Sequence, residues 1–166
     1  MVYNPNYKYP DTAAYKYVIG EFTKKNVTPD AIAEVVYGLQ HKFLPDVTVD
    51  EYKAEVLDTM HKREFLNNAM VGLALDNLAA ADALPQPLND IITNDVGVFG
   101  VDETIALGVS QLSGSIGITN YGFLDRTKPG IINQLDNAPG KVNTFIDDLV
   151  GALASAVAGK MAHKYA

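Results

Sequence analysis

Residues 143–163 read NTFIDDLVGALASAVAGKMAH and contain the most apolar tract of the chain, Leu149 to Gly159. Gly151, Ser155 and Gly159 lie four residues apart, so they share one face of a helix, and alanine fills most of the positions between them. Because such small side chains let neighbouring backbones come close, we expect this helix at the centre of a bundle. The apolar tract is too short for a membrane span, which needs about 20 residues.

Helical periodicity continues outward from this segment. Thr28 before Pro29, and Thr48 three residues before Glu51, are signals for helix N-termini. Apolar residues recur at helical spacing and no segment alternates with a period of two, so the sequence predicts an all-α protein. The expected helices are 11–26, 28–43, 48–60, 65–83, 88–92 and 101–113, then a broken or bent helix ending before Pro129, then 131–135 and 143–163.

Length and composition indicate one folded unit. The chain has 166 residues, of which 48% are hydrophobic and 20% charged, and it contains no internal repeat or linker. We expect residues 1–166 to form a single helical domain, with residues 1–10 as an irregular N-terminal arm. Because this arm is polar and aromatic, no signal peptide is predicted, and the absence of cysteine excludes disulfides and thiolate metal sites.

The charge of the chain is acidic and unevenly distributed. Twenty acidic residues against 13 basic ones give a net charge of -7, which argues against nucleic acid as a partner. Between Arg63 and Arg126 there is no lysine or arginine, although that stretch contains many carboxylates. A solvated acidic surface is the interpretation for three of them, Asp76, Asp82 and Asp90.

Common catalytic motifs are absent. The sequence contains no HExxH, no P-loop, no dinucleotide-binding glycine motif and no nucleophile elbow. His41, His61 and His163 are isolated near expected helix ends, where a favourable interaction with the helix dipole explains them. The glycine pair in 114–117 is interpreted as a helix bend.

Acidic residues from Asp95 to Asp148 are the best candidates for a site. Helix capping alone could explain Asp102-Glu103 at one helix start, and Asp147-Asp148 in a capping box with Thr144. Asp125 falls near a helix C-terminus, where a carboxylate is disfavoured, and Lys128 is its expected partner. Taken together, these acids with Asp136, Arg126 and Lys128 match a site for Mg²⁺ and phosphate, because a hard ion takes oxygen ligands from carboxylates, water and phosphate.

Ordered acidic motifs in this chain resemble those of a known family. The motifs are Val101-Asp102-Glu103, Phe123-Leu124-Asp125-Arg126-Thr127-Lys128-Pro129, Asp136, Gly140 and Ile146-Asp147-Asp148-Leu149-Val150-Gly151, and Gly117-Ile118-Thr119-Asn120-Tyr121-Gly122 is a further match. They resemble phosphatidylglycerophosphatase A, in particular its soluble branch in Gram-positive bacteria, which includes the low-temperature-requirement C proteins. The resemblance covers the chain from the helix at Val27 onward.

That resemblance implies a fold and an activity. The implied fold is a helical bundle with one helix surrounded by others. The implied reaction is Mg²⁺-dependent removal of the terminal phosphate of phosphatidylglycerophosphate, with Mn²⁺ as an alternative ion. The residues implied to bind or orient the metal are Asp102, Glu103, Asp125, Asp147 and Asp148. Those implied to stabilise the charge of the phosphate are Lys128 and Arg126.

Departures from the family leave the substrate open. Membrane members have transmembrane helices and a Gly-Thr-x-Gly-Ser loop, both missing here, and Asn94-Asp95 stands where they often have His-Asp. The expected substrate is therefore a phospholipid headgroup or a small phosphate ester, and the expected location is the cytoplasm with peripheral contact at the inner membrane surface. An alternative is a non-enzymatic helical module that binds a divalent metal or a protein partner through the acidic cluster. An exposed apolar face would permit a homo-oligomer.

Overall fold

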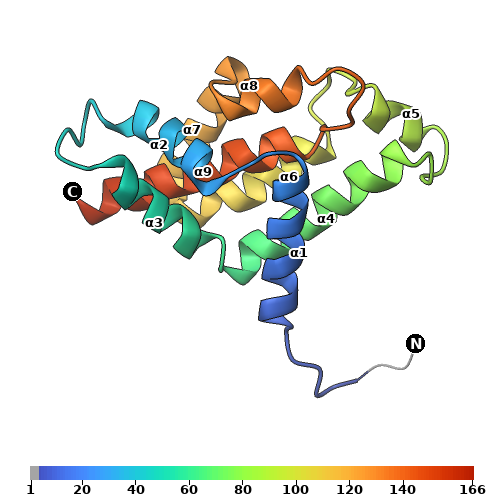
Figure 1. Ribbon diagram of the computed structural model, residues 1–166, viewed down its shortest axis with the longest axis horizontal. Coiled ribbons are helices and arrows are strands. Elements are labelled where there is room, and N and C mark those ends of the chain that lie inside the picture. Colours follow the sequence, from blue (N-terminus) through green and yellow to red (C-terminus); the bar gives the residue numbers. More distant parts are fainter. Residues whose placement is uncertain (1–3) are drawn as a thin grey trace.

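A computed structural model describes residues 4–166 (Figure 1). All regular elements in this part of the chain are helices, which confirms the predicted all-α fold. In chain order they are α1 (Asp11–Lys24), α2 (Pro29–Gln40), α3 (Val49–Thr59), α4 (Arg63–Ala80), α5 (Leu88–Thr93), α6 (Val101–Ser110), the 3₁₀ turn η1 (Gln111–Ser113), α7 (Gly114–Thr127), α8 (Ile131–Asp136) and α9 (Ile146–Lys164). No helix among residues 4–166 combines the length and the hydropathy that crossing a membrane requires.

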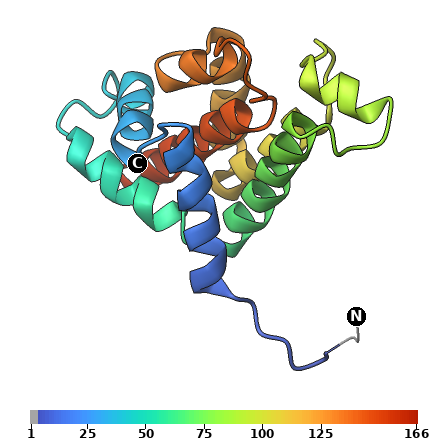
Figure 2. The same ribbon diagram turned by 45° about the vertical axis from the view of Figure 1, so that its right-hand side comes forward.

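The final helix lies at the centre of the bundle, as its small residues predicted. α9 runs through the middle of the molecule in both ribbon views (Figure 1 and Figure 2). Every residue from Ile146 to Gly159 is buried, and α9 packs against α2, α3, α4, α6, α7 and α8. α9 is therefore the element around which the other helices are placed.

Two glycines allow close approaches of the backbone at the start of α7. A Cβ at Gly117 would collide with the backbone carbonyl oxygen of Ser110, and a Cβ at Gly159 would lie 2.8 Å from Cβ of Ser113 and 3.0 Å from the backbone nitrogen of Gly117. Real Cβ atoms essentially never come as close as this to a carbonyl oxygen or to another Cβ. Gly159 thus allows α9 to approach the start of α7, and Gly117 allows α7 to approach the end of α6.

Predicted helix starts are confirmed where the local signal was strong. The Thr28 side chain accepts a hydrogen bond from the backbone N–H of Ala31 at the start of α2. Thr48 and Glu51 form the expected capping box at the start of α3. These side chains satisfy backbone donors that have no partner within the first helical turn.

Some boundaries differ from the expected ones. α2 ends at Gln40, and Phe43, which was expected to continue its apolar face, lies in the following turn and is 75% exposed. The expected helix break falls at Gly114, whose φ of 69° lies in the region that favours glycine. Beyond that residue α7 continues unbroken to Thr127, so the other glycines do not interrupt it. Of the expected N-terminal arm, residues 1–3 lie outside the described residues, and residues 4–10 form no helix.

Candidate metal centre

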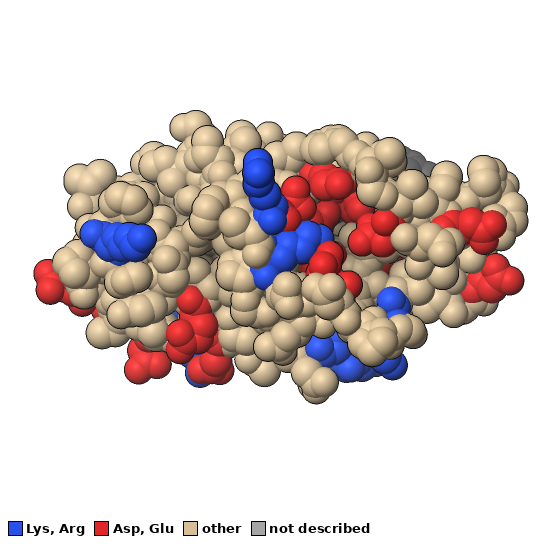
Figure 3. Space-filling view, turned by 90° about the horizontal axis from the view of Figure 1, so that it is seen from above, with Lys and Arg blue, Asp and Glu red and all other residues tan. Residues whose placement is uncertain are grey.

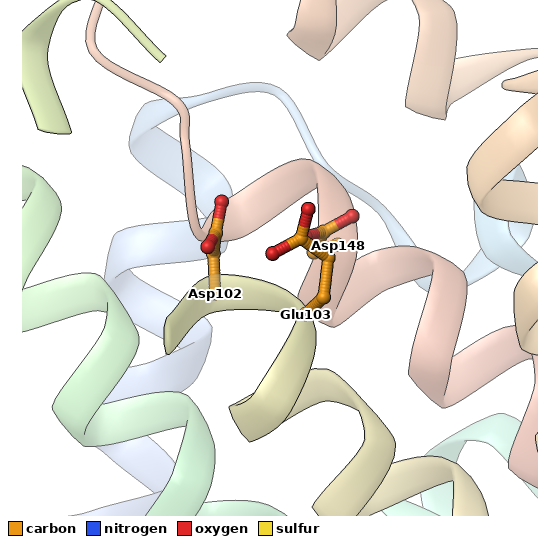
Figure 4. A group of neighbouring side chains, drawn as sticks. All are labelled: Asp102, Glu103 and Asp148. Atoms are coloured by element: carbon orange, nitrogen blue, oxygen red, sulfur yellow. The ribbon is translucent and has the colours of Figure 1, made fainter. Parts of the chain in front are cut away.

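Three carboxylates from two helices converge at one end of the central helix. Asp102 and Glu103 stand in the first turn of α6, and Asp148 faces them from the first turn of α9 (Figure 4). One oxygen from each of the three lies within 4.8 Å of the other two. Asp102 and Glu103 are half-buried and Asp148 is buried, so the group lies at the inner edge of the surface. Red carboxylates gather beside blue basic side chains on the face seen in Figure 3.

Local geometry at the start of α6 turns two adjacent carboxylates toward the same place. Glu103 reaches back to accept a hydrogen bond from the backbone N–H of Gly100. A Cβ at Gly100 would collide with Oδ1 of Asp102, so glycine leaves the space that the Asp102 carboxylate occupies. Sequence reasoning missed Gly100, because the collision depends on backbone angles that no motif reports. For Glu103, the capping role and a role in the site are compatible.

The N-terminus of α9 is capped by a residue that the sequence analysis misassigned. Asp76 of α4 accepts hydrogen bonds from the backbone N–H groups of Phe145 and Ile146, both at 3.1 Å, and is 1% exposed. The expected capping box of Thr144 with Asp147 is wrong, since the Thr144 hydroxyl donates to the carbonyl of Ile92 at 2.7 Å. Asp147 and Asp148 are therefore free for other contacts.

Asp76 was expected on a solvated surface, and burial instead raises its pKa to about 7. A sequence signal for this burial exists. Asp76 falls three residues after Leu73 and seven after Ala69, which places it on the buried face of α4. An acid on such a face must have a structural partner, here the start of α9.

Lys128 joins α7, α8 and α9 through two carboxylates. Its Nζ lies 2.6 Å from Oδ1 of Asp136 and 2.8 Å from Oδ2 of Asp147. The expected pairing of Lys128 with Asp125 is therefore wrong: Lys128 follows the end of α7 in a left-handed conformation, with φ of 39°, and it meets Asp147 and Asp136 instead. Burial alone would lower the pKa of Lys128, but the hydrogen bonds to these carboxylates raise it above its usual value.

Crowded acids make the site electrostatically strained without a cation. Burial raises the pKa of Asp148 to about 9, and repulsion from Asp147 and Asp125 adds to this shift. Burial raises the pKa of Asp102 to about 7, and its hydrogen bond with Glu103 acts in the same direction. The charge of Asp125 thus acts on Asp148, although Asp125 is outside the group of three carboxylates.

Two further groups of this site are buried polar atoms without a hydrogen-bond partner among residues 4–166. They are Oδ1 of Asp147 and the hydroxyl of Tyr121, whose residues are each 2% exposed. Burial, followed by the charges of Asp148 and Asp125, raises the pKa of Tyr121 far above its usual range. Tyr121 and Asp125 lie four residues apart in α7, so helical spacing places them on one face of that helix, and Lys128 follows its end. That spacing could have identified Tyr121 from the sequence.

The remaining candidates lie at the edge of the site. Burial raises the pKa of Asp95, the charge of Lys128 opposes this shift, and the charge of Asp136 adds to it. Asp95 therefore interacts electrostatically with the Lys128–Asp136 pair. Arg126 is exposed and forms no ion pair within the described part of the chain. The structure therefore brings together Asp102, Glu103 and Asp148, places Asp125 and the Asp147–Lys128 pair beside them, and leaves Arg126 at the surface.

Several known proteins are similar to this chain in sequence and in fold. The family model described as Phosphatidylglycerophosphatase A matches residues 19–163. The uncharacterized proteins YpjQ and YutG of Bacillus subtilis (strain 168) are both 41% identical to this chain over 142 residues, which cover 86% and 85% of this chain and 80% and 86% of theirs. The crystal structure of ypjQ matches with a TM-score of 0.89 and 38% identity, over 95% of this chain and 98% of that one. The low temperature requirement C protein from Listeria monocytogenes also matches with a TM-score of 0.89, at 42% identity, over 92% of this chain and 97% of that one.

Proposed function

Because the chain belongs to the phosphatidylglycerophosphatase A family, we propose that it is a metal-dependent hydrolase of phosphate monoesters. The observation that carries this proposal is the convergence of Asp102, Glu103 and Asp148 from two helices. Helix capping does not explain why carboxylates of two different helices approach one another. For α9, moreover, Asp76 already caps the N-terminus.

The donor set fits a hard divalent ion. All three converging groups offer carboxylate oxygens, and the buried Oδ1 of Asp147 has no partner in the described residues. We propose that Asp102, Glu103 and Asp148 hold Mg²⁺, with Mn²⁺ as an alternative, and that Asp125 and Asp147 orient ligands or water around it. A bound ion at this place supplies positive charge that stabilises the phosphate oxygens as the ester bond breaks.

The protein's own groups have distinct tasks in this proposal. Lys128 has three ammonium protons and uses two on Asp136 and Asp147, so the third is available to a phosphate oxygen. The Tyr121 hydroxyl is a second donor at the same end of the site. One carboxylate accepts a proton from the attacking water as its oxygen bonds to phosphorus, while the P–O bond to the alcohol breaks and the leaving oxygen takes up a proton from solvent water. Arg126, exposed at the rim, attracts the phosphate dianion.

The substrate we propose is phosphatidylglycerophosphate or a related phosphate ester. A lipid substrate requires that the protein work in peripheral contact with the membrane surface, so that the headgroup reaches the carboxylates. A small ester would reach them directly from solution. Both carry the same reacting group, a terminal phosphate monoester.

Phosphate release tests the proposal. The assay compares phosphatidylglycerophosphate in detergent micelles with glycerol phosphate and p-nitrophenyl phosphate, in Mg²⁺, Mn²⁺ and chelator. We expect release only with metal, and a loss of at least about 100-fold in Asp102→Asn and Asp148→Asn. Asp46→Asn, the same change at an exposed acid without an ion pair in the described residues, should retain full activity. If the protein binds the metal but releases phosphate from none of these esters, the non-enzymatic module is favoured instead.

A further inference from the structure

A second cleft of this acidic protein is lined by lysines. It has a volume of about 480 Å³ and lies between the end of α1, α8 and the segment that precedes α9. Its polar lining consists of Lys24, Lys25, Asn26, Gln134, Lys141 and Asn143, and among residues 4–166 no carboxylate lines it. In a chain with a net charge of -7, three lysines around one acid-free cleft are a local reversal of charge.

Lys25 is the central group of this cleft. Its half-buried Nζ donates to the carbonyl oxygen of Val142 at 2.7 Å and to Oδ1 of Asn143 at 2.5 Å, both neutral acceptors. Within residues 4–166 no carboxylate lies in ion-pair distance of Lys25 or Lys141, whereas Lys24 is paired with Glu21 at 2.6 Å. Two ammonium groups therefore face the cleft without a counter-charge.

Electrostatics support the same conclusion. Burial lowers the pKa of Lys25; the more distant Asp76 and Glu21 oppose this shift, and the charge of Lys141 adds to it. Lys25 and Lys141 thus repel each other across the cleft, and an anion between them would relieve that repulsion. The side-chain amides of Asn26 and Gln134 form no hydrogen bond within the described chain, so they offer further donors to such an anion.

We propose that this cleft is a binding site for a phosphate group, separate from the acidic site and independent of its metal. Lys25 and Lys141 supply the charge that a phosphate dianion needs, and Asn26 and Gln134 bind its remaining oxygens. The cleft is larger than one phosphate, so it accommodates the group that carries it. The phosphate comes either from a soluble ester or from a lipid headgroup.

Binding there would also reach the acidic site. Gln134 of α8 lines the cleft, and Asp136, two residues later on the same helix, accepts a hydrogen bond from Lys128. The segment containing Asn143 leads directly to Asp147 on α9. A phosphate held between these elements would therefore fix α8 and the start of α9 relative to α1.

Titration calorimetry with inorganic phosphate and pyrophosphate, in chelator, tests the proposal without the metal of the acidic site. We expect saturable binding that Lys141→Met weakens about tenfold, since it removes one charged hydrogen-bond donor. Lys42→Met, the same change at an exposed lysine elsewhere, should leave the affinity unchanged. Lys25→Met removes contacts to residues 142 and 143 and can unfold that segment, so Lys141→Met carries the test.

Vesicle sedimentation distinguishes the two sources of phosphate. Phosphatidylcholine vesicles with phosphatidic acid should retain the wild type more than Lys141→Met if the ligand is a headgroup, and pure phosphatidylcholine should retain neither. Binding of soluble phosphate without vesicle retention identifies a soluble ester. Absence of binding to both at up to about 10 mM phosphate, or equal binding by wild type and Lys141→Met, overturns the proposal. Activity assays at the acidic site are not involved, so either proposal can fail alone.

Discussion

Replacing Asp148 by asparagine should make the metal-free protein more stable and remove most of its response to Mg²⁺. Asp148 is 5% exposed, and its pKa in the folded protein is about 9, against an ordinary value of 3.8. The folded state therefore binds one proton more than the unfolded state between these pH values. The contribution of Asp148 to stability is fully present below pH 3.8 and is lost as pH rises toward 9.

The size of the effect follows from that shift. Each pKa unit corresponds to about 1.4 kcal/mol, so at pH 7 the wild type has lost about 4 kcal/mol that a neutral amide does not lose. Asp148→Asn should gain up to this amount in chelator, at about 2–4 °C of melting temperature per kcal/mol. Mg²⁺ at 100 times its Kd should stabilise the wild type by about 2.7 kcal/mol, whereas a variant with about 100-fold weaker binding gains only about 0.4 kcal/mol.

Thermal melts by circular dichroism at pH 6, 7 and 8, with Mg²⁺ and with chelator, measure both effects. In chelator the wild type should lose more stability across this series than Asp148→Asn, because Asp76 and Asp102 titrate in both proteins and Asp148 titrates only in the wild type. Asp46→Asn serves as the matched control and should behave as the wild type. If Asp148→Asn melts below the wild type in chelator, or responds equally to Mg²⁺, then Asp148 is a structural acid and the metal site is refuted.

Further predictions concern the residues that shape the site and the core. In urea titrations, Gly151→Leu and Ser155→Leu should each lower the free energy of unfolding by about 1–3 kcal/mol, because α9 becomes overpacked. Gly159→Ala should also lower it, since the added Cβ has no room. As the control, Gly20→Ala places its Cβ in open space on a helix and should raise the free energy of unfolding by up to about 1 kcal/mol. Gly100→Ala should displace the Asp102 carboxylate and weaken Mg²⁺ binding in calorimetry while the melting temperature in chelator stays constant, and Gly97→Ala, again in open space, should bind Mg²⁺ normally. Asp76→Ala should cost about 1–3 kcal/mol in urea titrations, because two buried N–H groups of α9 lose their acceptor. An equal effect of Asp46→Ala, at an exposed acid, would contradict that reason.

Sequence reasoning succeeded where the information is local. The small residues of α9 predicted its central position because the absence of bulk is visible in the sequence itself, and the capping box of Thr48 and Glu51 lies within four residues. It failed where the partner lies far along the chain. Asp76 caps a helix that begins 70 residues later, and this contact depends on the packing of α4 against α9.

The acidic site shows the same division. The sequence predicted that Asp102, Asp125 and one of the pair Asp147-Asp148 would converge. Asp102 and Asp148 do so, whereas Asp125 lies outside the group of three carboxylates. The sequence could not predict which of two adjacent acids would face the site, because neighbouring helical residues point about 100° apart. Asp147 thus contacts Lys128, and Asp148 contacts the acids of α6.

The close approach of α7 and α9 at Gly117 and Gly159 has a mechanical consequence for the site. Lys128 lies 11 residues beyond Gly117 along the chain, and Asp148 lies 11 residues before Gly159. At the rise of an α-helix, each of these two site residues is therefore about 16 Å from the point where α7 and α9 approach each other. A tilt of about 5° at this pivot would move Asp148 relative to Lys128 by more than about 1 Å, a displacement that can cost a catalyst about 100-fold in rate. The tolerance of the acidic site to error is therefore set at a distance from it, by two residues that carry no charge and touch no substrate.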